Sequence, residues 1–247
     1  YLLQLSYGLV SSEKAFELAT PNIDKALELN RDLAEGHAVM GLMKWQISDH
    51  LEDDKQKNKS IIKAKFHLNK AIEINPSNAE AYMWYGSILE NEGDYESGIK
   101  FRKKAYELDP QAAVVGYNRA KDLVRQGDYK EAMDVFNTVV RFNPNYPNAY
   151  DIAGEVSFQV GQLDQAYNMY NRLSELGDED AMWLVNLSRI YIPFGEYALA
   201  QKNVDQLQKK TTGNFAEKFD WLQAELWIAK QDFESLKQWT DTFPEET

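Results

Sequence analysis

Apolar residues recur along the chain at steps of three and four, in short segments that come in pairs. Tyr82, Tyr85 and Leu89 follow this spacing in one segment, and Phe101 and Ala105 follow it in the next. Such spacing places the apolar side chains on one face of a helix. The pattern therefore predicts an all-α chain built from pairs of antiparallel amphipathic helices.

A glycine marks the turn between the two helices of a pair and recurs every 34 residues, at Gly93, Gly127, Gly161 and Gly195. Glycine tolerates the positive φ that is needed just past the end of a helix. The residue after it, as in Asp94, is expected to cap the second helix. The aromatic residue that follows, as in Tyr95, is expected to pack back across the turn. We refer to these turns as the joints.

Other positions repeat with the same period. Small residues precede each joint glycine by seven positions, at Gly86, Ala120, Gly154 and Ser188, and allow close approach of the two helices. Asn75-Pro76, Asp109-Pro110 and Asn143-Pro144 end the second helix of a pair, because proline cannot continue it. The unit resembles the tetratricopeptide repeat. The resemblance implies an all-α, right-handed superhelical solenoid (TPR) of about seven antiparallel helix pairs.

This frame divides the chain into repeats. Four regular repeats cover residues 79–112, 113–146, 147–180 and 181–214, after a longer one at 34–78. The excess of the long repeat, around 48–59, is highly charged and predicts an exposed inserted loop or an extension of the helices. Residues 1–33 form a degenerate pair, and residues 215–247 a capping pair in which Gln231 replaces the joint glycine. We predict a single solenoid domain over 1–247.

Charge and composition narrow the function. The formal net charge is -12, which disfavours binding to the phosphates of nucleic acids or to anionic membranes. The sequence contains no run of about 18 apolar residues, so we expect no membrane insertion by this domain. It contains no Cys, which removes disulfides and thiol nucleophiles. The 44% of hydrophobic residues suffices for a packed core.

Residues suited to catalysis are scarce. The three histidines are His37, His50 and His67, and the first and last fall in predicted helices of one repeat, where a structural role is expected. His50 with Asp53 and Asp54 lacks the fixed ligand spacing of a metal site. The glycines form neither a GxxxxGK[ST] nor a GxGxxG motif. We therefore expect no enzyme activity, no catalytic residue, no cofactor and no metal.

The repeat resemblance implies a partner-binding surface. In such repeats the first helix of each pair lines a concave groove that binds peptides or protein segments. Transferring the groove positions residue by residue gives Met83, Tyr117, Lys121, Arg125, Asp151, Glu155, Phe158 and Arg189. The aromatic residues are candidate anchors, and the cations are candidates for holding an acidic segment. Alternatively, some of these side chains simply pack on neighbouring helices.

A second resemblance involves the first 41 residues, through Leu33-Ala34-Glu35-Gly36-His37 to Gly41. They look like the opening of the repeat domain of bacterial membrane-bound winged-helix transcription regulators. The chain begins at Tyr1 without Met, so we expect a domain of a longer protein. The main hypothesis is a non-catalytic scaffold that binds a protein or peptide. The alternative is a sensory or self-associating homo-oligomeric domain of such a regulator, which implies a periplasmic location; otherwise we expect a cytoplasmic one.

Overall fold

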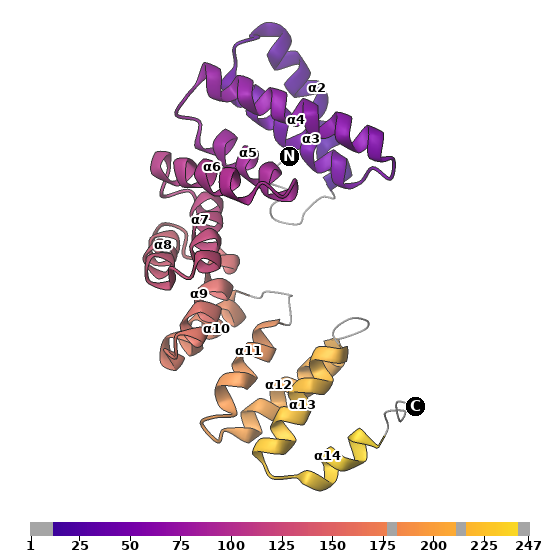
Figure 1. The fold of residues 1–247 in the computed structure, drawn as a ribbon, viewed down its shortest axis with the longest axis vertical. Coiled ribbons are helices and arrows are strands. Elements are labelled where there is room, and N and C mark those ends of the chain that lie inside the picture. The colour runs from indigo at the N-terminus through magenta and orange to yellow at the C-terminus, as the bar shows by residue number, and fades with distance from the viewer. Residues whose placement is uncertain (1–11, 177–181, 211–215, 242–247) are drawn as a thin grey trace. The chain divides into compact units, whose positions relative to one another are not determined.

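All regular elements in the described part of the chain are α-helices (Figure 1). The computed structural model describes residues 12–176, 182–210 and 216–241. Within these ranges thirteen helices follow one another. The all-helical fold predicted from the sequence is confirmed. The chain divides into two compact units, residues 1–126 (unit 1) and 127–247 (unit 2).

Unit 1 contains six described helices. They are α2 (Ser12–Leu29), α3 (Ala34–Asp49), α4 (Asp54–Ile74), α5 (Ala79–Asn91), α6 (Tyr95–Leu108) and α7 (Ala113–Gln126). Ala38, Ala64 and Leu68 are buried between α3 and α4, and Ala81 and Ile88 extend this cluster to α5. The small residues allow the close approach that their spacing predicted. The first 11 residues of the degenerate pair predicted over 1–33 lie outside the described residues.

The excess residues of the long repeat are mainly helical. Helix α3 ends at Asp49 and α4 begins at Asp54, so only four residues separate them. The Asp53 carboxylate caps α4 by accepting hydrogen bonds from the backbone N–H groups of Lys55 and Gln56, at 2.7 and 3.1 Å. Of the two alternatives left open by the sequence, the structure shows an extension of both helices.

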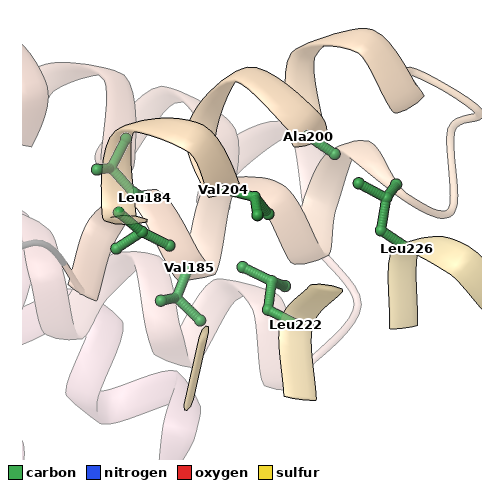
Figure 2. Close-up of a cluster of buried hydrophobic side chains, with 7 residues drawn as sticks. Leu184, Val185, Ala200, Val204, Leu222 and Leu226 are labelled. Carbon is green, nitrogen blue, oxygen red and sulfur yellow. The ribbon is translucent and has the colours of Figure 1, made fainter. Parts of the chain in front are cut away.

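Unit 2 contains α8 (Tyr129–Phe142), α9 (Pro147–Gln159), α10 (Leu163–Glu175), α11 (Met182–Tyr191), α12 (Tyr197–Lys210), α13 (Ala216–Ala229) and α14 (Phe233–Thr240). One of its core clusters joins α11, α12 and α13 (Figure 2). Leu184, Val204 and Leu222 are almost completely buried there. Truncating such a leucine to alanine typically costs about 2–5 kcal/mol. This cluster holds α13 beside α11, which positions the pocket described below.

The joints have the backbone conformation that the sequence predicts. The joint glycines have φ between 76° and 89°, and Gln231 takes the same left-handed conformation with φ of 58°. The carboxylates of Asp94 and Asp232 accept hydrogen bonds from the backbone N–H groups of Ser97 and Ser235. A positive φ at Gln231 therefore identifies the last joint, although its residue is not glycine.

Two details of the joints differ from expectation. The Tyr95 side chain is exposed, so it does not pack back across the turn as predicted. Asp128 precedes α8 but makes no side-chain hydrogen bond to the helix terminus. The joint glycine sets the chain reversal, whereas the capping bond and the aromatic contact vary from one joint to the next.

Candidate functional site

A pocket of about 590 Å³ lies in unit 2, along α9, α11 and α13. We call it the Arg189 pocket. It is lined by Asp151, Glu155, Phe158, Gln159, Tyr170, Val185, Asn186, Arg189 and Trp221. Four of the groove residues predicted from the sequence, Asp151, Glu155, Phe158 and Arg189, are thus brought together around one cavity.

Arg189 is held by two aromatic rings. Its guanidinium carbon lies 5.1 Å from the ring centroid of Phe158 on α9 and 5.5 Å from that of Trp221 on α13. A cation within about 6 Å of an aromatic face is attracted by the ring quadrupole. Guanidinium groups stack on such faces and keep their N–H donors along the edge of the plane. The contacts therefore orient Arg189 in a pocket where its N–H groups can serve a ligand.

Two carboxylates form an acidic wall. Asp151 and Glu155 are one helical turn apart on α9, which places them on the same face of that helix. Burial, followed by the negative charges of Asp151 and Glu155, raises the pKa of the Tyr170 hydroxyl, so this group stays protonated at neutral pH. Burial also raises the pKa of Glu225 on α13, and the charge of Arg189 opposes that shift. The pocket thus combines one oriented cation with nearby carboxylates.

The predicted groove residues on α7 are engaged within unit 1. The Lys121 ammonium lies 5.4 Å from the centroid of the Tyr117 ring, and Arg125 forms an ion pair with Glu90 of α5. Burial alone would raise the pKa of Glu90, but the hydrogen bond from Arg125 and the charges of Arg102, Arg125 and Lys121 lower it. These α7 side chains form an internal set of contacts that a partner would need to rearrange.

Met83 lies in the core and not on an open surface. Its side chain packs with Ala105 and Val115, and the Asn118 side-chain N–H group donates to its sulfur at 3.9 Å. Helix α7 covers this position of α5 within unit 1. The structure therefore corrects the placement of Met83 in the groove, because a buried thioether cannot contact a partner without repacking of unit 1.

Sequence reasoning missed Trp221, which was treated only as part of the capping pair. It precedes the joint residue Gln231 by ten positions, as Tyr117, Asp151 and Val185 precede their joint glycines. Alignment on the positive φ of Gln231 places Trp221 at a groove position. The sequence already gives this register, because Gln231 replaces the joint glycine, but the groove positions were not carried into the capping pair.

The described residues contain no group of three or more potential metal-ligating side chains. Nor does any helix among the described ranges have the length and apolar character needed to cross a membrane.

Comparisons with known proteins agree with the repeat architecture. The family model of the tetratricopeptide repeat protein 21 C-terminal ARM domain matches residues 50–156. The structure of Pseudomonas aeruginosa pilF superposes with a TM-score of 0.66 at 20% identity, covering 85% of this chain and 95% of pilF. YrrB superposes with a TM-score of 0.57 at 19% identity, covering 85% and 97%. The chain therefore has the tetratricopeptide-repeat fold, and that resemblance is confirmed.

Three individual proteins are similar to this chain in sequence. Anaphase-promoting complex subunit 3 of Schizosaccharomyces pombe is 28% identical over 103 residues, which is 42% of this chain and 16% of the relative. RNA polymerase II-associated protein 3 of Homo sapiens is 26% identical over 131 residues, 53% and 20% of the two chains. Transcriptional regulator HilA of Salmonella typhimurium is 25% identical over 162 residues, 65% and 29%. The matches span less than a third of each relative, and HilA supports the resemblance to bacterial regulators.

Proposed function

We propose that the chain is a non-catalytic protein-interaction scaffold that binds a segment of another protein in the Arg189 pocket. The observation that carries this proposal is that the Arg189 guanidinium lies within cation–π distance of both Phe158 and Trp221, in a pocket that Asp151 and Glu155 also line. Arg and aromatic side chains contribute much of the binding energy of protein interfaces. Their convergence in one cavity favours recognition of a ligand over simple core packing.

The pocket chemistry suits a polypeptide that presents both charges. The edge of the Arg189 guanidinium offers N–H donors to a carboxylate, whereas Asp151 and Glu155 accept from a Lys or Arg side chain. Trp221 is 51% exposed and offers an apolar surface to a ligand side chain. YrrB is a TPR protein with an unusual peptide-binding site, which supports testing peptides first.

The absence of enzyme activity is part of this proposal. Nucleophilic catalysis needs a nucleophile beside a base that is itself oriented by a third group. The titratable groups that line the pocket are carboxylates, an arginine and a tyrosine that stays protonated. This set suits recognition of a charged segment better than acid–base catalysis at neutral pH.

The similarity to HilA motivates a second candidate function. The match covers 65% of this chain, and HilA is a transcriptional regulator. In this alternative the chain is a sensory or self-associating domain of a bacterial transmembrane transcription regulator. Concentration-dependent dimerisation of the purified chain, with no peptide bound by the pocket, would favour it over the scaffold.

Selection of short random peptides on the immobilised chain tests the scaffold proposal. The affinities of the recovered peptides are then measured by calorimetry for the parent chain and for Arg189→Ala. Loss of a cation that is stacked and contacts a ligand charge costs about 1–2 kcal/mol, so we expect a weakening of about tenfold. Trp221→Ala is expected to weaken binding to a similar extent.

Arg172→Ala is the matched control. Arg172 lies on α10 of the same unit and pairs with Glu175 at 2.8 Å, but it does not line the pocket. The Arg172→Ala variant should bind the recovered peptides with the same affinity as the parent. Equal binding by Arg189→Ala and the parent would place the ligand elsewhere, and recovery of no peptide at all would contradict the scaffold proposal.

A further inference from the structure

A second concave surface in unit 2 is lined by exposed aromatic and aliphatic side chains. This pocket, of about 410 Å³, is formed by the first turn of α10, the end of α11, the joint after it and the start of α12. We call it the Phe194 pocket. Phe194 is 58% exposed, Leu199 42% and Tyr167 38%. It shares no lining residue with the Arg189 pocket.

The repeat fold does not require these apolar residues. The position before the joint glycine, occupied by Phe194, holds Glu92, Gln126 and Val160 at the other three joint glycines. The position four residues after the glycine, occupied by Leu199, holds Ser97, Glu131 and Gln165 elsewhere. The same turn therefore forms with polar side chains at both positions. Exposed apolar groups that neither the turn nor the core needs mark a surface suited to binding.

The floor of the pocket is ordered. The rings of Tyr167 on α10 and Tyr191 on α11 pack edge to face, with centroids 6.0 Å apart. Tyr191 also packs against the buried clusters on both sides of α11. Because Tyr191 is anchored in the core and Tyr167 packs against it, these rings lose less side-chain entropy when a ligand arrives than free side chains would, which favours binding.

The rim of the pocket is acidic. Asp164 and Glu196 line it, and no Lys or Arg is among its lining residues. Two copies that met symmetrically through this surface would bring their own carboxylates together, in a protein that already carries a net charge of -12. Charge complementarity therefore favours a cationic occupant over a second copy of this chain.

We infer that the Phe194 pocket is a docking site for a partner segment that inserts a bulky apolar side chain and carries Lys or Arg on either side of it. The apolar side chain occupies the concavity between Phe194, Leu199 and the tyrosine rings. The flanking cations pair with Asp164 and Glu196. This site and the Arg189 pocket give unit 2 two separate places to hold polypeptide.

The test is a differential selection of short random displayed peptides. Peptides are selected on the parent chain and counter-selected on the double variant Phe194→Gln with Leu199→Gln. Both substitutions introduce a residue that the chain itself has at the equivalent position of another joint, Gln126 or Gln165. The variant is therefore expected to fold, which circular dichroism verifies. Val160→Gln is the matched control, since Val160 is exposed at the equivalent position of another joint but does not line this pocket.

The proposal predicts recovered peptides with a Trp, Phe, Leu or Met flanked by Lys or Arg. These peptides should bind the double variant at least about tenfold more weakly than they bind the parent. They should bind Val160→Gln with the same affinity as the parent. Asp164→Asn with Glu196→Gln should weaken binding and reduce its dependence on salt. Recovery of no differential peptides, or of acidic ones, would overturn the inference. Sedimentation that shows a parent dimer lost in the double variant would instead assign the surface to a second copy.

Discussion

The two units fill the same repeat position with opposite chemistry. In unit 1, Arg102 of α6 lies against Gly86 of α5, and a Cβ at Gly86 would approach the Arg102 side chain to 2.9 Å. Two repeats later in unit 2, Tyr170 of α10 lies against Gly154 of α9, where a Cβ would approach the tyrosine ring to 2.6 Å. A glycine on the first helix thus accommodates a large buried side chain from the second in both units.

Arg102 is part of a buried ionic network. Arg102 and Asp122 are each 1% exposed and form two hydrogen bonds, at 2.8 and 2.6 Å. Arg102 also donates to the Gly86 carbonyl at 3.0 Å and lies 2.8 Å from Glu90. At the position equivalent to Asp122, unit 2 has Val156 and Ile190 instead. The repeat geometry constrains the side-chain volume at the position shared by Arg102 and Tyr170. The polarity of that side chain can change if the residues that contact it change as well.

The largest expected effect comes from breaking the ionic network on one side. Asp122→Ala leaves the buried Arg102 guanidinium without its bidentate partner and should destabilise unit 1 by about 3 kcal/mol. We expect the low end of the usual range because Glu90 remains beside Arg102. The free energy of unfolding of each unit is measured by a urea titration in which hydrogen exchange reports on the two units separately. Separate readouts are needed because a chain with two units need not unfold in one step.

Two controls sharpen the comparison. Tyr170→Phe in unit 2 removes only a hydroxyl and should change stability by less than about 1 kcal/mol. The double variant Arg102→Met with Asp122→Leu imitates the apolar solution of unit 2 and should be close to the parent or more stable. If the double variant were as unstable as Asp122→Ala, the two solutions would not be interchangeable.

The next effect concerns the two glycines. Gly86→Ala and Gly154→Ala should each destabilise their unit by about 1–3 kcal/mol through overpacking. The causes differ, because a Cβ at Gly86 also approaches the backbone carbonyl of Gly98 to 2.8 Å, whereas the nearest atoms at Gly154 all belong to the Tyr170 ring.

A second substitution separates these causes. Tyr170→Leu makes room beside position 154 and should make the added Gly154→Ala change less costly. Arg102→Leu should not rescue Gly86→Ala to the same extent, because the Gly98 carbonyl stays in place. Equal rescue in both units, measured by thermal unfolding, would argue against a backbone clash in unit 1.

The smallest effect on stability is expected from lowering the pH. All three histidines are in unit 1. The His37 and His67 rings face each other with their Nδ1 atoms 2.9 Å apart, and His37 Nε2 donates to the Arg31 carbonyl at 3.0 Å. In the neutral pair His37 Nδ1 must therefore accept, and His67 Nδ1 must donate. Burial, followed by the charges of His37, Lys44 and Lys63, lowers the pKa of His67 to about 4, and the charge of Asp24 opposes this.

The sign of the acid effect follows from this lowered pKa. The unfolded chain binds the His67 proton near pH 6.5 and the folded chain only near pH 4, so unit 1 loses stability as the pH falls through this window. Solvent screening at this half-buried ring limits the loss to about 1–2 kcal/mol. Burial raises the pKa of Glu80 in unit 1 and of Glu225 in unit 2, so these groups act in the opposite direction in both units.

Hydrogen exchange of the two units at pH 7 and near pH 4.5, corrected for the intrinsic rate, measures this difference. His67→Gln should remove most of it. A parallel loss of protection in both units, or an unchanged loss in His67→Gln, would show that other groups control acid unfolding.

The sequence predicts the features that depend on local periodicity. The joint glycines and the prolines specified the ends of the helices, because each acts through its own backbone, and the fixed spacing of the small residues marked the faces along which the helices approach. The Arg102–Asp122 pair was not predicted, since each residue alone resembles a solvated surface charge and the two are 20 positions apart on different helices. Trp221 was missed because the groove positions were not extended to the capping pair, whereas Met83 was misplaced for a related reason. Exposure depends on which neighbouring helix covers a position, and that is decided by packing between repeats.

The half-exposed indole of Trp221 gives the Arg189 pocket an optical reporter. Indole fluorescence shifts to shorter wavelength when water is removed from the ring. A segment that covers the pocket removes water from the exposed half of Trp221. Difference spectra between the parent and a Trp221→Phe variant isolate this signal from the other five tryptophans, so the pocket reports its own occupancy without a label.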